Sequence, residues 1–194
     1  MENLTEVNNL YCDEKVFDAC SIFGMMNLKG ERFSAKDPIR AIANMHDRGN
    51  GLGGGFAAYG IYPEYKDDYA FQIMYLDRDA KKKTDRLLND SFNILNEEEM
   101  PTQPANVRDP PIMWRYFLQP KKSRAKTQTV NDYIIENVMR INTETGKAFV
   151  FSSGKNMGVF KGVGFPEDVG EYFCLEDYKG YLWTCHGRFP TNTP

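Results

Sequence analysis

The chain has 194 residues, 41% of them hydrophobic and 13% aromatic, which fits one compact domain with its own core. Its net charge of −3 excludes a generally basic nucleic-acid-binding protein, and no stretch approaches the roughly 20 apolar residues of a membrane span. Residues 1–19 are acidic and lack the basic start and apolar run of a secretory signal. We therefore expect a cytoplasmic protein whose four cysteines are reduced.

The first predicted elements are a strand and a helix. Residues 17–28 form an apolar run that predicts a buried strand. Asp37 and Pro38 have the residue types of a helix N-cap and of the first helical position, so we expect a helix from here to near Arg48. Its inner face is expected to hold four residues: Ile39, Ile42, Ala43 and His46.

A glycine-rich loop follows this helix over residues 49–55, and a strand resumes at Phe56. The aromatic and β-branched pattern of residues 69–76 predicts another strand. Residues 77–95 predict a helix, and residues 97–111 a loop broken by prolines. The inner face of that helix is expected to hold Leu87, Leu88, Phe92 and Leu95.

The remaining elements alternate between strands and helices without a strict βαβ rhythm, so we expect a layered α+β domain. Strands are predicted at 112–118, 147–153, 156–165 and 180–189, and helices at 129–141 and 166–173. The inner face of the first of these helices is expected to hold Val130, Tyr133, Ile134, Val138 and Ile141.

Cys20 opens the strand sequence "CSIFG" and has two interpretations. A free cysteine is often a small buried hydrophobe. Alternatively it is a nucleophile, which needs a base. The base could be one of two histidines, His46 and His186. It could also be the α-amine of Cys20 itself, with a pKa of about 8, if the Ala19–Cys20 bond were cut and residues 1–19 were removed.

The glycine-rich loop and the closing "CHGRFPTNTP" are the other candidate sites. The loop lacks the G-x-x-x-x-G-K-[ST] pattern and follows a helix, so a glycine stop at a helix end explains it better than a phosphate cradle. In the closing motif, Arg188 offers a planar bidentate donor that suits a carboxylate, with Thr191 close by in sequence. The closing motif alone would also fit an ordinary surface loop.

Together the three motifs resemble the class II glutamine amidotransferase family, most closely the glutaminase domain of glutamate synthase. "HGRFPTNTP" is the most specific match, "DRGNGLGGGFAAYG" is moderately specific, and "ACSIFG" fits the family's opening except that Ser21 stands where glycine is usual. The resemblance implies an α+β fold of the αββα four-layer type found in N-terminal nucleophile hydrolases. It also implies that residues 1–19 are a propeptide-like segment and that residues 20–194 belong to the amidotransferase domain.

The resemblance implies a role for each matched residue. Cys20 would be the nucleophile that hydrolyses the side-chain amide of glutamine, and its freed α-amine would be the general base. Arg188 would hold the α-carboxylate of glutamine, with Thr191 nearby. Arg48 and Gly49 would shape the pocket close to the nucleophile.

The family's oxyanion hole comes from an Asn-Gly pair in an "HNGE"-like stretch after the "RFPTNT" motif, and this sequence does not contain that stretch. Losing even one oxyanion donor typically costs about 10²–10³ in rate. We therefore expect the fold to be incomplete at its C-terminus and the 194-residue chain alone to be a poor or inactive glutaminase. The alternative is a catalytically inactive, amidotransferase-like module that binds or senses glutamine.

The expected partners are glutamine and a synthase domain or subunit that receives the ammonia, with 2-oxoglutarate as the acceptor in glutamate synthesis. No cofactor is expected in this chain, because no flavin, iron–sulfur or nicotinamide signature is present. A metal site built from Cys174, Cys185 and His186 has the ligand types but lacks a fourth ligand at the usual spacing, so no metal is expected.

Overall fold

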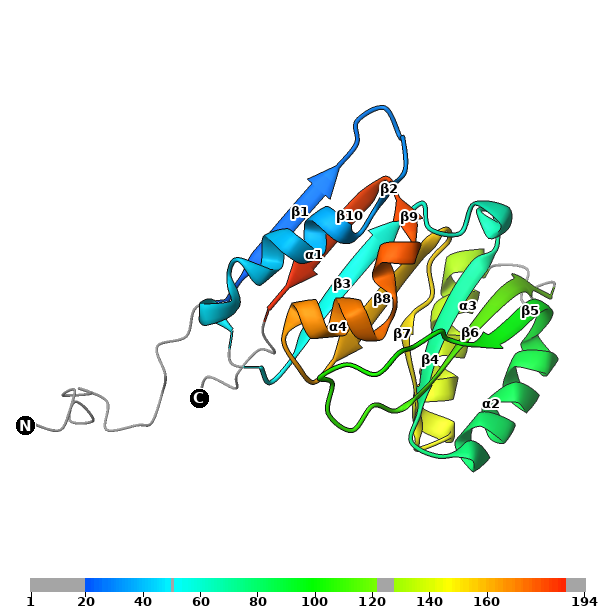
Figure 1. Cartoon of the computed structure of the whole chain (residues 1–194). Helices are drawn as coiled ribbons and strands as arrows, with labels where there is room; N and C mark the ends of the chain where they lie inside the picture. The colour runs from blue at the N-terminus through cyan, green and yellow to red at the C-terminus, as the bar shows by residue number, and fades with distance from the viewer. Residues whose placement is uncertain (1–19, 50, 122–127, 188–194) are drawn as a thin grey trace, which may run out of the picture.

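The computed structural model describes residues 20–49, 51–121 and 128–187. These ranges form a mixed α+β structure with two four-stranded antiparallel sheets and one two-stranded sheet (Figure 1). The expectation of an α+β domain is confirmed at this level. The arrangement depends on antiparallel pairing throughout, which agrees with the absence of a βαβ rhythm in the sequence.

The first sheet has the spatial strand order β1-β10-β3-β8, and α1 and α4 pack on one of its faces (Figure 1). The closing strand β10 lies in the middle, between β1 and β3, so both ends of the described chain meet here. The elements are β1 (Ile22–Met26), α1 (Lys36–Ala43), β3 (Gly54–Tyr59), β8 (Met157–Gly162), α4 (Pro166–Tyr172) and β10 (Leu182–His186).

The second sheet has the order β5-β6-β4-β7, and α2 and α3 pack on it (Figure 1). Its elements are β4 (Tyr69–Tyr75), α2 (Arg78–Ser91), β5 (Phe92–Glu99), β6 (Ile112–Pro120), α3 (Val130–Glu144) and β7 (Ala148–Ser152). The edge strand β8 of the first sheet contacts β4 and β7 of the second. Shorter elements complete the described chain: β2 (Phe33–Ser34), β9 (Lys179–Gly180), η1 (His46–Arg48), η2 (Pro63–Tyr65) and η3 (Leu175–Asp177).

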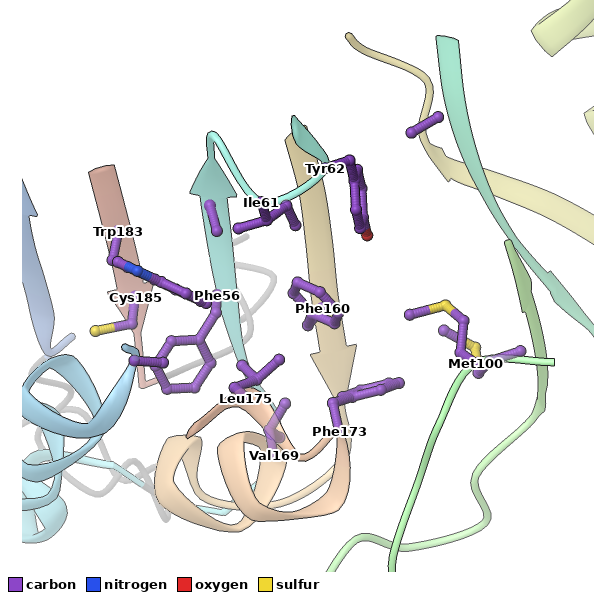
Figure 2. Close-up of a cluster of buried hydrophobic side chains, with 14 of the residues drawn as sticks. Phe56, Ile61, Tyr62, Met100, Phe160, Val169, Phe173, Leu175, Trp183 and Cys185 are labelled. Atoms are coloured by element: carbon purple, nitrogen blue, oxygen red, sulfur yellow. The ribbon is translucent and has the colours of Figure 1, made fainter. Parts of the chain in front are cut away.

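Two hydrophobic clusters hold the sheets. One lies between the second sheet and its two helices and includes Phe71, Leu88 and Phe92. The other lies between the first sheet and α1 and α4, and extends to Met100 beside the second sheet. Figure 2 shows this cluster, with aromatic side chains from β3, β8 and β10 gathered above α4. Each fully buried large side chain contributes roughly 1.5–3 kcal/mol, so these clusters supply most of the driving force for folding.

The expectation of a buried strand at 17–28 is wrong for the part that the structure describes. A strand does form as β1, but Ile22 is 76% exposed and Met26 is 52% exposed. β1 is an edge strand, and only one of its faces packs on α1. Apolar character alone could not distinguish this half-covered edge from a central strand.

The first helix is shorter than expected. It starts at Lys36 with Ala35 as its N-cap, so Asp37 and Pro38 lie inside the first turn, where a missing backbone N–H has no cost. It ends at Ala43, and His46 belongs to the separate turn η1 and is exposed.

The largest error concerns residues 92–99. The predicted helix over 77–95 ends at Ser91, and the predicted loop begins inside a strand, because Phe92–Glu99 pairs along β6. Leu95 is 43% exposed rather than inward. Tertiary pairing overrides a weak helical preference here. Val130, also expected inside, is 53% exposed at the first turn of α3.

Candidate functional site

Cys20 lies directly before β1 and is exposed, with a free thiol. The next residue, Ser21, is buried, and its carbonyl accepts a hydrogen bond of 2.9 Å from the N–H of Gly187. The strand register continues this pairing, with Ile22 opposite His186. The interpretation of Cys20 as a buried hydrophobe is therefore wrong, and the thiol sits beside the end of β10.

Arg188 and Thr191 lie outside the described residues, although the sequence places Arg188 directly after Gly187. Gly187 is held in a tight space, because a Cβ atom there would overlap Ser21 Oγ and lie 3.0 Å from Pro166 Cγ. The backbone leading to the candidate carboxylate-binding arginine is thus packed against both the Cys20 segment and the start of α4.

The glycine-rich loop approaches the same end of α4. A Cβ atom on Gly49 would lie 3.3 Å from the ring of Phe165, and one on Gly51 would lie 3.0 Å from it. Gly51 also has a positive φ of 66°, a conformation that glycine adopts without strain. A Cβ atom on Gly54 would lie 2.9 Å from the N and Cα atoms of Pro166. The loop needs glycine because a helix terminus lies against it.

Arg48 and Gly49 are positioned by η1. The N–H of Gly49 donates to the carbonyl of His46 at 2.8 Å, and the side chain of Arg48 is exposed. Two of the predicted pocket residues therefore lie at the same end of the first sheet as Cys20. The link runs through Phe165 and Pro166, which contact the loop on one side and Gly187 on the other.

His46 is engaged with α4. Its Nδ1 forms an ion pair and hydrogen bond with Glu167 Oε1, and its ring stacks on Phe165 with centroids 3.7 Å apart. The hydrogen bond to Glu167 raises the pKa of His46 above its ordinary value. These two contacts fix the His46 ring against the start of α4.

His186 points to the other face of the first sheet. It lies next to Ile22 across β1 and β10, and lines a cavity of about 230 Å³ together with Lys161, Thr184 and Val159. Lys161 and His186 flank Gly55, since a Cβ atom on that glycine would lie 3.2 Å from Lys161 Cγ and 3.3 Å from His186 Nε2. The second candidate base thus occupies a separate surface from the loop that carries Arg48.

The other described cysteines differ sharply from Cys20. Cys185 is buried, and burial raises the pKa of its thiol to about 12. Burial also raises the pKa of Cys174. Within the described ranges the cysteines are free, and no group of three or more His, Cys, Asp or Glu side chains could hold a metal ion. None of the helices in those ranges has the length and apolarity to cross a membrane.

The structure adds Phe165, Pro166 and Glu167 to the site. The sequence indicated only that a short helix starts here, because a proline followed by acidic residues is typical of a first helical turn. Nothing local connects this turn to the glycine-rich loop, which is more than a hundred residues away, as the 121-residue separation of His46 and Glu167 illustrates.

Comparison with known proteins gives one informative match. No protein-family model matches the chain. The chain is 56% identical over 186 residues to a protein of Archaeoglobus fulgidus that is named "Uncharacterized protein". The match covers 93% of this chain and 49% of that protein, so the chain spans about half the length of the curated relative that it matches.

Proposed function

We propose that the chain belongs to a class II glutamine amidotransferase domain that hydrolyses glutamine to glutamate and ammonia. The observation that carries this proposal is the convergence of the three motifs. The loop with Arg48 and Gly49 packs against Phe165, Gly187 packs against Pro166, and Gly187 is hydrogen-bonded to Ser21, the residue after the exposed Cys20.

The chemistry follows from the groups present. The Cys20 thiolate attacks the side-chain amide carbon of glutamine, ammonia leaves with a transferred proton, and water hydrolyses the thioester to glutamate and a free thiol. The base is the freed α-amine of Cys20, as the family resemblance implies, and this requires cleavage of the Ala19–Cys20 bond. Arg188 would fix the α-carboxylate of glutamine so that positioning lowers the barrier.

The proposal extends to the fold and to the ammonia acceptor. Two four-stranded antiparallel sheets, each carrying a pair of helices, support an αββα architecture of the N-terminal nucleophile hydrolase type. The acceptor would be 2-oxoglutarate, bound to a synthase domain or subunit that also holds any redox cofactors.

The test is covalent labelling with 6-diazo-5-oxonorleucine, a glutamine analogue that alkylates the nucleophile. Intact mass first shows whether residues 1–19 are removed, and peptide mapping then locates the label. We expect modification of Cys20, its loss in Cys20→Ser, and no change in Cys12→Ser. Glutamine added in excess should protect Cys20 against the label.

Labelling at another cysteine would contradict the proposal. Glutamine binding measured by calorimetry without any label on Cys20 would instead support the alternative, an inactive module that binds glutamine. An unprocessed chain that still becomes labelled would keep Cys20 as nucleophile and remove its α-amine as base.

A further inference from the structure

The segment Phe165–Glu167 contacts both halves of the candidate site. Phe165 lies against Gly49 and Gly51, and Pro166 lies against Gly54 and Gly187. Glu167 then binds His46, which is the first residue of η1. One short stretch at the start of α4 therefore touches the loop that carries Arg48 and the backbone that pairs with the Cys20 segment.

We propose that Glu167 is a positioning residue that acts through His46 to hold Arg48 and Gly49 against the start of α4, at the end of the first sheet where the Cys20 segment pairs with Gly187. The importance of this position for a glutamine pocket rests on the proposed function. The positioning itself is a property of the fold and is measured separately.

The geometry explains how one carboxylate can hold a loop. η1 has three residues, and the Gly49 N–H is bonded to the His46 carbonyl, so a displacement of His46 moves Arg48 and Gly49 with it. The ring of His46 is fixed on two sides, by the stack on Phe165 and by the bond from Nδ1 to Glu167. Without the carboxylate, the stack alone leaves the ring free to slide in its plane.

The stabilisation that the His46–Glu167 pair can give is limited, because both side chains are partly exposed to water. The side chain of His46 is 48% exposed and that of Glu167 is 25% exposed, so the pair is partly screened by water. Exposed ion pairs contribute about 0.2–1 kcal/mol. Glu167 therefore controls local opening of the loop rather than the stability of the whole fold.

The charges around His46 give the positioning a pH dependence. The facing groups on α4 are Glu167 and Asp168, and Asp47 is its neighbour on η1. Because these carboxylates raise the pKa of His46, the ionic contribution is complete at pH values below the unfolded pKa of about 6.5. It is lost as the pH rises through the higher pKa of the folded state.

Amide hydrogen exchange of the 194-residue chain, followed by NMR, tests this proposal. In Glu167→Gln, we expect the protection factors of the Arg48 and Gly49 amides to fall about two- to fivefold below the pKa of His46, the range that an exposed ion pair supports. Above that pKa the variant and the original chain should converge. The His46 ring resonances should also titrate at lower pH in the variant.

Glu171→Gln is the matched control, since it removes the same charge from an exposed position on α4 that does not contact His46. Amides of β3 and β8 report whether the fold is intact. His46→Gln, which also removes the stack on Phe165, should lose at least as much protection, with no further loss when combined with Glu167→Gln. Unchanged protection in Glu167→Gln, or an equal loss in the control, would overturn the proposal.

The outcome is separable from that of the labelling experiment. If Glu167→Gln loosens the loop but 6-diazo-5-oxonorleucine labels a cysteine other than Cys20, the positioning role stands and the glutaminase proposal fails. If Cys20 reacts and the loop protection is unchanged, the glutaminase proposal stands and the positioning role fails.

Discussion

At the scale of single residues, the described cysteines are separated by their surroundings. Cys20 is exposed before β1, whereas Cys185 is 2% exposed in the core under α1. The Cys185 thiol is oriented toward the carbonyls of Phe23 and Pro38, at 3.7 and 3.8 Å, in a region that disfavours a thiolate. A cysteine that is to act as a nucleophile needs access and ionisation, and only Cys20 of this pair has access.

This difference predicts selective alkylation. With a pKa of about 12, Cys185 is ionised to about one part in 10⁴ at pH 8, and its burial blocks the reagent as well. We expect iodoacetamide to modify Cys20 at least about 100-fold faster than Cys185 in the folded chain, by the same ionisation argument. Mass spectrometry of timed samples measures both rates. In 8 M urea, roughly the concentration that unfolds most domains, the two rates should become similar. Comparable rates in the folded chain would contradict the structure.

The candidate residues differ in whether the neighbouring sequence is enough to identify them. Cys20, Arg48 and Gly49 could be selected from the sequence because each belongs to a short motif with a recognisable pattern. Glu167 could not be selected, because its role depends on a contact with His46 across 121 residues. Short motifs identify reacting groups, whereas the residues that hold them in place depend on tertiary packing.

At the scale of elements, periodicity was sufficient where an element is long and strongly patterned. β4 is rich in aromatic and apolar residues and forms within one residue of the predicted range 69–76, as Tyr69–Tyr75. The end of α2 was missed because Phe92 and Ile94 continue an apolar pattern while pairing with β6. A helix that passes directly into a strand at Phe92 gives no glycine or proline to mark the boundary.

The contact of β3 with the start of α4 is an element-scale feature that can be tested. Gly54→Ala should lower the free energy of unfolding by about 1–3 kcal/mol, the cost of overpacking. The new Cβ would lie 2.9 Å from backbone atoms of Pro166, which cannot rotate away as a side chain could.

Gly24→Ala is the control for this prediction, because it also replaces a strand glycine in the first sheet. Its Cβ would meet nothing closer than Thr184 Cγ2 at 3.8 Å, so its effect should stay within about 0.5 kcal/mol, as at other unconstrained sites. Urea unfolding at pH 7 measures both variants. Equal losses would show that the close approach of Gly54 to Pro166 does not exist in solution.

At the scale of the whole molecule, the two large sheets are joined by a buried polar network. Gln72 on β4 accepts a 2.6 Å hydrogen bond from the N–H of Val159 on β8 and donates one of 3.0 Å to the Tyr62 hydroxyl. Arg115 on β6 donates to the same hydroxyl and, at 2.6 Å, to Glu98. Since β8 is an edge strand, Gln72 satisfies a backbone donor that no neighbouring strand reaches.

The network predicts that the two sheets unfold together and that Gln72 couples them. Gln72 is fully buried, so Gln72→Ala leaves the Val159 N–H without this partner, at a cost of about 1–3 kcal/mol, while the Tyr62 hydroxyl keeps its bond from Arg115. Gln119→Ala, which removes an exposed bond to Asp68, should change stability by less than about 0.5 kcal/mol.

Native-state exchange in Gln72→Ala should lose protection equally in β3 and in β6, because an opening that separates the sheets exposes both. A loss confined to one sheet would mean that each sheet is stable without the other.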